Sequence, residues 1–333
     1  MSDAELKGWN HLPDVPLKVS PFFTWPPDPA AMVKWVWNSW FLISEKLILV
    51  GIAFASFAWF QPPLEETRSF AFGWIAEMYL RNLLLALGIG GALHLWFYTF
   101  SAQGKRLKYD PRPLMAKGRQ FTLGGQIRDN MFWTLGSGVV IWTAYEVICF
   151  WALANGYMPL VTWAAHPVWF VAIFLLIPVW ESFYFYCIHR LIHVPFLYRH
   201  VHYLHHRNIN VGPWSGMSQH PVEQMIFLGS VFVHLIVGAH PVHILFHLQY
   251  FFLTAMTTHT GFEGLVIKDR NRLKLGTFHH QMHHRYFECN YGSLEIPWDK
   301  WMGTFHDGTV EANERMQERR KRIMGRQGAA RIP

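Results

Sequence analysis

The stretch PVWFVAIFLLIPVWESFYFYCIHRLIHVPFLYRHVHYLHH, residues 167–206, places a long apolar run directly before two groups of histidines. The run ends at Ile188 and is long enough to cross a bilayer, since a crossing helix needs about 20 apolar residues. The histidines follow at once, as HRLIH at residues 189–193 and HYLHH at residues 202–206. A third group, HQMHH, lies at residues 280–284. The pattern predicts a histidine-rich site at the edge of a membrane.

Histidines at this density indicate metal binding, because imidazole is the commonest metal ligand in proteins and is neutral over most of the physiological pH range. Four residues apart on a helix, His189 and His193 share one face. In the other two clusters adjacent rings lie about 100° apart, so that they point at different ions. A structural zinc needs only four ligands. The clusters therefore predict a site for two metal ions, with the ligands His189, His193, His202, His205, His206, His280, His283 and His284.

Two histidines outside the clusters are further predicted ligands. His259, in the sequence THTG, follows an apolar stretch that returns to the same face of the membrane, and His220 lies in SQHPVE. Zinc suits imidazole but has no redox chemistry, and the sequence has no HExxH motif of a zinc hydrolase. Iron with open positions can reduce dioxygen and attack an aliphatic C–H bond. We therefore expect two non-haem iron ions.

The composition is that of a membrane protein. Of the 333 residues 51% are hydrophobic and only 15% are charged, whereas charged residues make up about a quarter of a soluble domain. The net charge of +7 comes from basic residues beside apolar segments and in the C-terminal tail. This placement indicates membrane topology and contact with anionic lipid, not nucleic-acid binding. The three cysteines form no disulfide framework, which is typical of a reducing compartment.

The hydrophobic runs predict four membrane spans, at about residues 41–60, 82–100, 131–154 and 167–188. The loop 104–128 is rich in Lys and Arg, and the loop 155–166 has neither. By the positive-inside rule the first of these loops is cytoplasmic. The fourth span then returns to the cytoplasm just before His189, so we expect the histidine site to face the cytoplasm.

A further apolar stretch, Met225 to Met256, is interrupted at Gly238-Ala-His-Pro241. Its arms are short for a full crossing, and they predict a re-entrant or interfacial hairpin whose break is covered by protein. The fold class expected is an all-α membrane protein with about four transmembrane helices, this hairpin and a cytoplasmic helical cap that carries the dimetal site. The expected parts are a cytoplasmic N-terminal segment, the transmembrane helices, a catalytic region and a basic tail, at residues 1–40, 41–188, 189–310 and 311–333.

The stretch from about Ser182 to Phe305 resembles the fatty acid hydroxylase and sterol desaturase superfamily of integral-membrane di-iron oxidases. The resemblance rests on the three histidine clusters, on His-Pro-x-Glu at His220 and on His-x-Gly at His259. It is supported by Asn-Tyr-Gly at residues 290–292 and Trp-Asp at residues 298–299. An additional histidine at His279 and the segment GPWSG at residues 212–216 depart from the usual pattern.

The resemblance implies hydroxylation or desaturation of a lipid or sterol-like substrate, with dioxygen as oxidant. It also implies a separate electron donor, a reductase working through a ferredoxin or a b-type cytochrome. The ligand role is carried over to the ten histidines named above, His220 included. The alternative function is that of a membrane protein that binds or transports zinc. A bacterial inner membrane and the endoplasmic reticulum are both compatible with the sequence.

Overall fold

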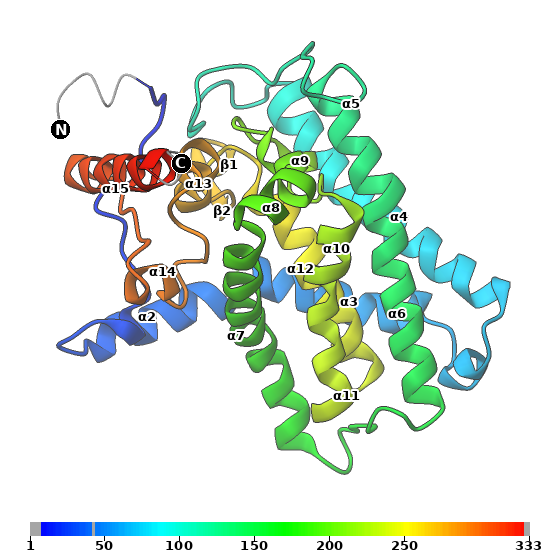
Figure 1. The fold of residues 1–333 in the computed structure, drawn as a ribbon. Helices are drawn as coiled ribbons and strands as arrows, with labels where there is room; N and C mark the ends of the chain where they lie inside the picture. The colour runs from blue at the N-terminus through cyan, green and yellow to red at the C-terminus, as the bar shows by residue number, and fades with distance from the viewer. Residues whose placement is uncertain (1–7, 42–43, 330–333) are drawn as a thin grey trace.

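The fold is a bundle of helices that carries the histidine-bearing elements at one end. The computed structural model describes residues 8–41 and 44–329 of the chain. Helices α6 (Val139–Ala154), α7 (Pro167–Ile192) and α12 (Pro241–Thr258) run along one another, and α4 (Phe72–His94) packs against α6 and α12. Figure 1 shows α9 (Tyr203–His206) and α13 (Phe278–Tyr286) at the same end of this bundle. The predicted all-α membrane fold is confirmed.

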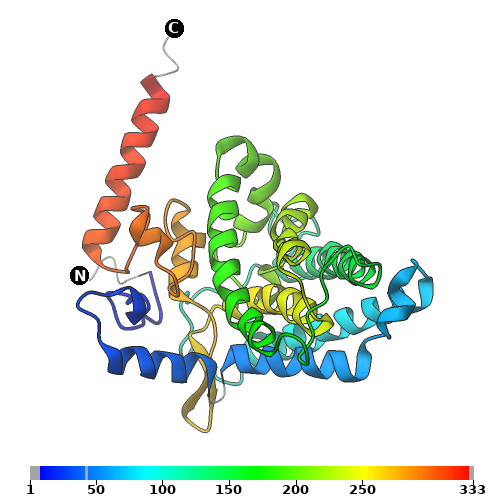
Figure 2. The same cartoon turned by 90° about the horizontal axis from the view of Figure 1, so that it is seen from below.

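In the part of the chain that the structure describes, four helical segments are long and apolar enough to cross a membrane, namely Pro29–Phe60, Phe72–Thr99, Gln126–Ala154 and Pro167–Ile192. The first consists of α2 (Pro29–Trp40) and α3 (Glu45–Phe60). Figures 1 and 2 show α2 and α3 lying crosswise to α6 and α7, along one side of the bundle. The protein is therefore an integral membrane protein, as its composition predicts.

The second segment begins ten residues before the predicted span. The prediction placed the start after the charged Arg81, whereas α4 continues through it from Phe72. The reason is a buried polar contact with α6, in which Arg81 Nη2 donates to Glu146 Oε1 at 2.5 Å and Asn82 Nδ2 donates to Glu146 Oε2 at 2.6 Å. Because the charges neutralise each other inside the bundle, the helix can include them.

Three of the helices contain π-helical turns, which have one more residue per turn than the α-helix that they interrupt. Leu95–Thr99 (η3) ends the second segment, and Phe132–Gly138 (η4) joins α5 (Gln126–Met131) to α6. The third, Tyr198–His202 (η5), lies between α8 (Pro195–Leu197) and α9 and includes the first histidine of the second cluster. Side chains that follow these turns point in other directions around the helix axis than they would in a continuous α-helix.

The predicted hairpin is present, and its second arm forms the centre of the protein. Helix α10 (Pro221–Leu228), the 3₁₀ turn Gly229–Val233 (η7) and α11 (His234–Val237) make the first arm. The chain then breaks at Gly238, whose φ of 79° lies in the region that favours glycine. Helix α12 follows and is buried along nearly its whole length.

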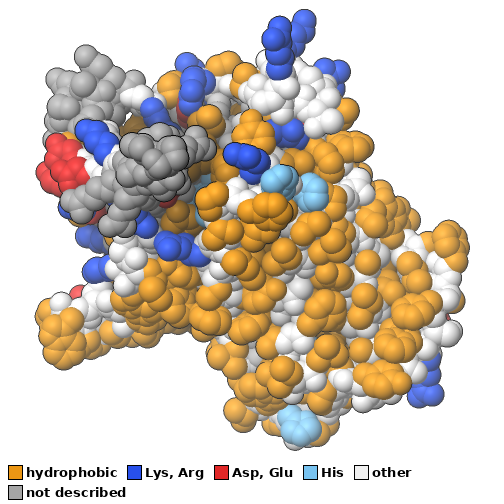
Figure 3. Space-filling model, in the orientation of Figure 1, with side chains coloured by type: hydrophobic (Ala, Val, Ile, Leu, Met, Phe, Trp, Pro, Cys, Tyr) orange, Lys and Arg blue, Asp and Glu red, His pale blue; other side chains and the backbone are white. Residues whose placement is uncertain are grey.

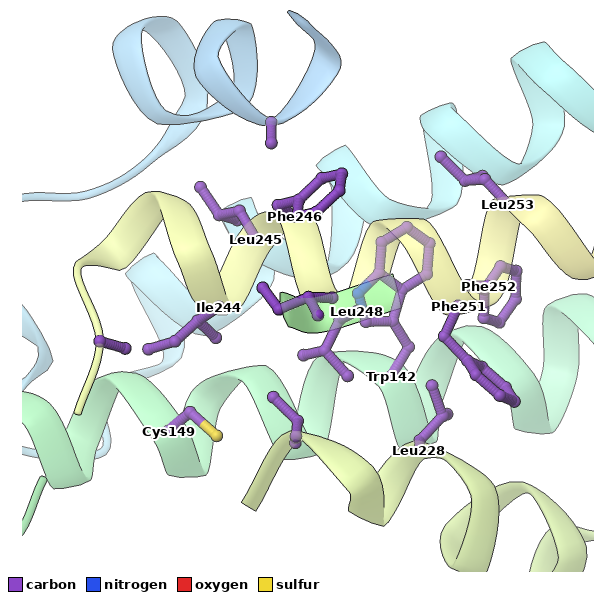
Figure 4. Packing of buried hydrophobic residues seen from close by; sticks show 14 of the residues in the cluster. Trp142, Cys149, Leu228, Ile244, Leu245, Phe246, Leu248, Phe251, Phe252 and Leu253 are labelled. Carbon is purple, nitrogen blue, oxygen red and sulfur yellow. The ribbon is translucent and has the colours of Figure 1, made fainter. Parts of the chain in front are cut away.

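Close packing around α12 forms the main hydrophobic core. Trp142 of α6 stacks on Phe252 of α12, with ring centroids 4.6 Å apart, and both side chains are fully buried. Figure 4 shows these rings with Phe246, Leu248 and Leu228 between the helices. Burial of this apolar surface, at about 25 cal/mol per Å², fixes the position of the helix that leads into His259.

The remaining elements form the cap and its connections. A strand pair, β1 (Gly264–Ile267) and β2 (Arg270–Lys274), is antiparallel and was not predicted from the sequence. The other short elements are α14 (Trp298–Trp301) and the 3₁₀ turns Pro21–Phe23 (η1), Leu64–Arg68 (η2) and Pro213–Ser215 (η6). The basic tail forms α15 (Val310–Ala329), which Figure 2 shows projecting from the bundle.

The outer surface agrees with a membrane location. Large apolar side chains of α7 are exposed, including Val168, Leu175, Leu176, Val179 and Phe183. Figure 3 shows hydrophobic side chains over most of the lower face and Lys and Arg gathered toward the upper end, the end that carries α9 and α13 in Figure 1. An apolar surface of this extent is typical of contact with lipid.

Candidate metal centre

Nine of the ten predicted ligands lie in two compact groups. The first group, called here the five-histidine group, consists of His189, His193, His202, His206 and His283. The second, the four-histidine group, consists of His205, His259, His280 and His284. Within each group one nitrogen from every ring lies within 4.8 Å of the others. All nine rings are buried except His193, which is partly exposed.

Adjacent histidines divide between the two groups, as their helical spacing predicts. On α9, His206 joins the five-histidine group and His205 the other. On α13, His283 belongs to the first group, while His280 and His284, four residues apart, belong to the second. Two short helices thus supply ligands to both groups, because neighbouring side chains on a helix point about 100° apart.

Hydrogen bonds at Nδ1 fix the tautomers of four rings. The Nδ1–H groups of His189 and His283 donate to the carbonyls of Tyr291 and Cys289, at 2.6 and 2.7 Å. His259 Nδ1 donates to the carbonyl of Ala255 at 2.7 Å. A carbonyl oxygen can only accept, so in each neutral ring the proton is on Nδ1 and the lone pair is on Nε2.

His202 is held in the same way by a carboxylate. Its Nδ1 donates to Oε1 of the fully buried Glu223 at 2.7 Å. Such outer contacts orient a metal-binding ring and raise its basicity. The lone pairs of these rings therefore point to the centres of the two groups.

The Nε2 atoms of each group lie close enough together to bind one metal ion. In the five-histidine group three Nε2 pairs are 3.0–3.2 Å apart, and in the four-histidine group three more pairs span the same range. Two neighbouring nitrogens that bind one ion at about 2.1 Å lie about 3.0–3.4 Å apart. The spacing of these pairs therefore fits two ligands of one ion.

Burial keeps the imidazoles neutral. It lowers the pKa of His202, His206 and His284 well below the usual range, and the neighbouring imidazoles lower it further. Burial also lowers the pKa of His205 to about 4. A neutral ring keeps the lone pair that a cation requires.

The tenth predicted ligand, His220, lies outside both groups. Its ring caps the N-terminus of α10, where Nδ1 accepts a hydrogen bond from Val222 N at 3.2 Å. Its partner in the motif, Glu223, is the residue that reaches the centre, through His202. His279 is likewise outside both groups, with Nε2 3.7 Å from Asp299 Oδ2.

Asp299 supports the site in a manner that the sequence did not indicate. Its Oδ1 accepts from Tyr291 N at 2.9 Å and from Thr304 Oγ1 at 2.6 Å, and its Oδ2 accepts from Gly292 N at 2.7 Å. The carboxylate thus fixes the loop whose carbonyls orient His189 and His283. A backbone carbonyl acceptor cannot be recognised from the residue type. In the sequence, only the Asn-Tyr-Gly and Trp-Asp motifs indicate that this loop is part of the site.

Gly216 has a corresponding role beside the four-histidine group. A Cβ at this position would overlap the carbonyl oxygen of Ala255 and come within 3.1 Å of His259 Nδ1. That carbonyl orients His259. The close approach of the segment 212–216 to the end of α12 therefore requires a glycine, which explains part of its unusual sequence.

A cavity of about 290 Å³ opens beside the two groups. Metal-group histidines from both groups line one part of it, among them His189, His202 and His280. Apolar side chains of α7, α10 and α12 line much of the rest, including Phe185, Phe227 and Phe251. The arrangement can hold an apolar molecule with one of its carbons next to the metal groups.

Comparison with known proteins finds a family model and several relatives that match part of this chain. Residues 174–304 match the model of the fatty acid hydroxylase family. A Delta(7)-sterol 5(6)-desaturase of Gibberella zeae is 31% identical over 159 residues, which cover 45% of this chain and 49% of that protein. The Delta(7)-sterol 5(6)-desaturase of Saccharomyces cerevisiae is 32% identical over 120 residues, 36% of this chain and 32% of the other.

A second kind of relative also matches this chain. Sphinganine C4-monooxygenase 1 of Arabidopsis thaliana is 25% identical over 151 residues, which cover 44% of this chain and 56% of that protein. The chain thus spans from a third to somewhat over half the length of these curated relatives. Comparison with solved structures finds no match.

Proposed function

We propose, from the premise that this chain belongs to the fatty acid hydroxylase and sterol desaturase superfamily, that it is a di-iron enzyme that hydroxylates or desaturates a lipid with dioxygen. The observation that carries the proposal is the convergence of nine imidazoles into two buried groups with lone pairs directed inward. The names of the relatives support oxidation of a sterol or a sphingolipid base.

The nine histidines of the two groups are the proposed ligands, and His220 is not among them. Two iron ions bound there would supply the dioxygen chemistry needed to cleave an unactivated C–H bond. Hydroxylation follows R–H + O₂ + 2 e⁻ + 2 H⁺ → R–OH + H₂O, and desaturation of a CH–CH unit uses the same inputs and releases two molecules of water. The two electrons come from a separate reductase acting through a ferredoxin or a b-type cytochrome.

The residues of this chain have three tasks in that reaction. The Nδ1 contacts to Tyr291, Cys289 and Glu223 hold the ligand rings in one tautomer and orientation. The aromatic side chains of the cavity exclude water and hold the hydrocarbon. Positioning then selects the product, because the substrate carbon that has lost its first hydrogen either gains a hydroxyl group or the neighbouring carbon loses a second hydrogen.

The proposed orientation places the metal groups at the cytoplasmic side. The basic loop 104–128 follows the second membrane segment. The backbone of Lys108 in this loop forms an antiparallel β-bridge with Phe262, three residues after His259. The loop and the site therefore lie at the same end of the bundle. Lys- and Arg-rich loops of this length face the cytoplasm.

The test compares the wild type with His283→Ala and, as a matched control, His200→Ala. His200 is exposed and belongs to neither metal group. Membranes of expressing cells are supplied with a b-type cytochrome or a ferredoxin and its reductase, and lipid extracts are analysed by mass spectrometry. We expect a species heavier by one oxygen, or lighter by two hydrogens, with the wild type and His200→Ala and none with His283→Ala.

Elemental analysis of the purified proteins accompanies this test. We expect about two iron ions per chain in the wild type and fewer in His283→Ala. Zinc without iron, together with lipid profiles that are the same for all three proteins, would contradict the proposal and favour the alternative of zinc binding or transport.

A further inference from the structure

One histidine of the five-histidine group reaches the surface of the protein. His193 directly follows the last residue of α7, and of the nine metal-group rings it alone is partly exposed. It does not line the cavity, so its exposed part opens elsewhere. Its Nε2 atom lies 3.1 Å from His202 Nε2 and 3.2 Å from His206 Nε2. The ring therefore connects the five-histidine group with the outside of the protein.

The second nitrogen of this ring lacks the contact that four other metal-group rings have. The Nδ1 atoms of His189, His202, His259 and His283 each contact an acceptor inside the protein. Among the residues that the structure describes, none accepts from His193 Nδ1, and this nitrogen is not one of the buried atoms without a partner. It is therefore accessible. A neutral ring that binds metal through Nε2 carries its proton on Nδ1, so an acceptor from outside the chain fits this position.

The surface around this ring is basic. Residues 189–207 contain three arginines and no aspartate or glutamate. Arg207 pairs with Asp129. In the described part of the chain no carboxylate forms an ion pair with the partly exposed Arg190 or the exposed Arg199. Figure 3 shows Lys and Arg side chains above the apolar face, at the end where α8 and α9 lie in Figure 1. Unpaired arginines on a surface attract a partner of negative charge.

Two tyrosines lie between these charges and the metal group. The rings of Tyr198 and Tyr291 lie 5.5 and 4.8 Å from the His193 ring. The Arg190 guanidinium stacks on Tyr291 at 4.8 Å. The partly exposed carboxylate of Glu288 interacts electrostatically with both tyrosines, and its charge opposes that of the arginines. We call the residues Arg190, His193, Tyr198, Arg199 and Glu288 the His193 surface.

Electrons for the proposed reaction have to reach the metal groups through the surface of the protein. The cavity holds the substrate in the proposed function, and apolar side chains line much of it. At the His193 surface a single imidazole separates the outside from the five-histidine group. Proteins that exchange electrons meet through small, weak interfaces, in which complementary charge brings the partners together.

We propose that the His193 surface is the docking site of a one-electron carrier protein with an acidic face, and that electrons enter the metal centre through His193. The inference rests on the proposed function and adds the place where the electron donor binds and the charge of its face. Arg190 and Arg199 attract the carrier, Glu288 opposes it, and a carboxylate of the carrier fits the free N–H of His193. Two successive carriers, each oxidised by one electron, deliver the two electrons that the reaction consumes.

The test measures binding of carriers of opposite charge to the purified, iron-containing protein in an uncharged detergent. A plant-type ferredoxin and the soluble domain of a b-type cytochrome are the acidic probes, and a basic c-type cytochrome is the opposite probe. We expect at least one acidic probe to bind about tenfold more tightly than the basic probe at low salt. The difference should shrink at about 0.2 M salt, where charges are screened within about 7 Å.

Variants with charge changes of opposite sign distinguish docking from an effect on folding. Arg190→Gln and Arg199→Gln should each weaken binding of the acidic probe about two- to fivefold, the usual effect of one exposed charge, and Glu288→Gln should strengthen it by a similar factor. Arg272→Gln, at an exposed arginine of β2, is the matched control and should keep the wild-type Kd. Figure 2 shows this strand pair on the far side of the molecule from the end of α7.

A second readout follows the electrons. Protein with ferric iron is mixed with the reduced acidic probe or with photoreduced deazariboflavin, a small uncharged reductant, and the absorption of the iron is recorded. With the probe below saturation, reduction should be slower in both arginine variants and faster in Glu288→Gln. Reduction by deazariboflavin should be the same in all of them, because a small uncharged molecule does not depend on these charges.

Three results would overturn the proposal. These are equal binding of acidic and basic probes, an unchanged Kd in both arginine variants, and loss of acidic-probe binding when anionic lipid is added, which would assign the arginines to the membrane. Iron content and size-exclusion profile verify that each variant is folded. Iron content and the oxygen-dependent lipid product test the di-iron function separately. A protein that binds the acidic probe through this surface but holds no iron would refute the function and keep the docking site.

Discussion

Replacing Asp299 by asparagine should weaken one metal group and spare the other. Asp299 makes no contact with a metal-group ring but fixes the loop whose Tyr291 and Cys289 carbonyls orient His189 and His283. Both of those rings belong to the five-histidine group. In the four-histidine group the ring of His259 is oriented by a hydrogen bond from its Nδ1 to the Ala255 carbonyl, which belongs to α12.

The size of the effect follows from the hydrogen bonds that change. Asparagine keeps Oδ1 as an acceptor for Tyr291 N and Thr304 Oγ1 but turns an NH₂ group toward Gly292 N–H, which then has no acceptor. Loss of a hydrogen bond to a charged group costs about 1.5–3 kcal/mol. Loss of an outer contact to a ligand typically weakens metal binding about 10- to 100-fold. We therefore expect a 10- to 100-fold rise in the Kd of one iron ion.

The assay is a competition titration of Fe(II) against a chelator of known affinity, with iron counted by elemental analysis. The wild type should show two tight ions, and Asp299→Asn one tight and one weakened ion. Asp269→Asn, a change at an exposed aspartate that pairs with Arg106, is the matched control and should resemble the wild type. If both ions weakened equally, or neither did, the assignment of this loop to the five-histidine group would be wrong.

Three further variants test other parts of the structure. Gly216→Ala should lower iron content toward one ion per chain, because its Cβ displaces the Ala255 carbonyl that orients a ligand; retention of two ions in elemental analysis would contradict this. His220→Ala should keep both ions and lose only a helix cap, about 1 kcal/mol of stability, and loss of an ion would return it to the ligand set. Glu146→Ala leaves the buried Arg81 without its ion pair, so the free energy of unfolding should fall by about 3–5 kcal/mol, seen as a lower Tm in detergent; an unchanged Tm would show that the pair is not buried in the folded protein.

The sequence predicts most of the fold and of the metal groups because both depend on short-range patterns. Apolar runs of sufficient length predict the spans, and the start of the second span was misplaced only because the partner of Arg81, Glu146, is far away in the chain. Histidines three and four residues apart predict shared and divergent faces of a helix, which the division of His205 and His206 reproduces.

Features that depend on the backbone of distant segments could not be predicted. The carbonyls of Tyr291, Cys289 and Ala255 are chemically the same as any others, and only folding places them beside imidazoles. The buried contacts among Glu181, Ser230, His234 and His247 could not be predicted for a related reason. These residues come from four separate elements, and in the sequence each one is an isolated polar residue in an apolar segment.

The π-helical turn at Tyr198–His202 has a consequence for how the second cluster tolerates insertions and deletions. A π-helical turn behaves as a helix that has absorbed one additional residue. Deleting one residue between Tyr198 and His202 would convert it to an ordinary α-helical turn that covers nearly the same rotation with one residue fewer, so His205 and His206 would keep their directions. If the same five residues formed an α-helix without a deletion, both side chains would turn together by about 100°, although each histidine motif would remain intact in the sequence. The π-helical turn is therefore as much a part of the metal centre as the motif itself.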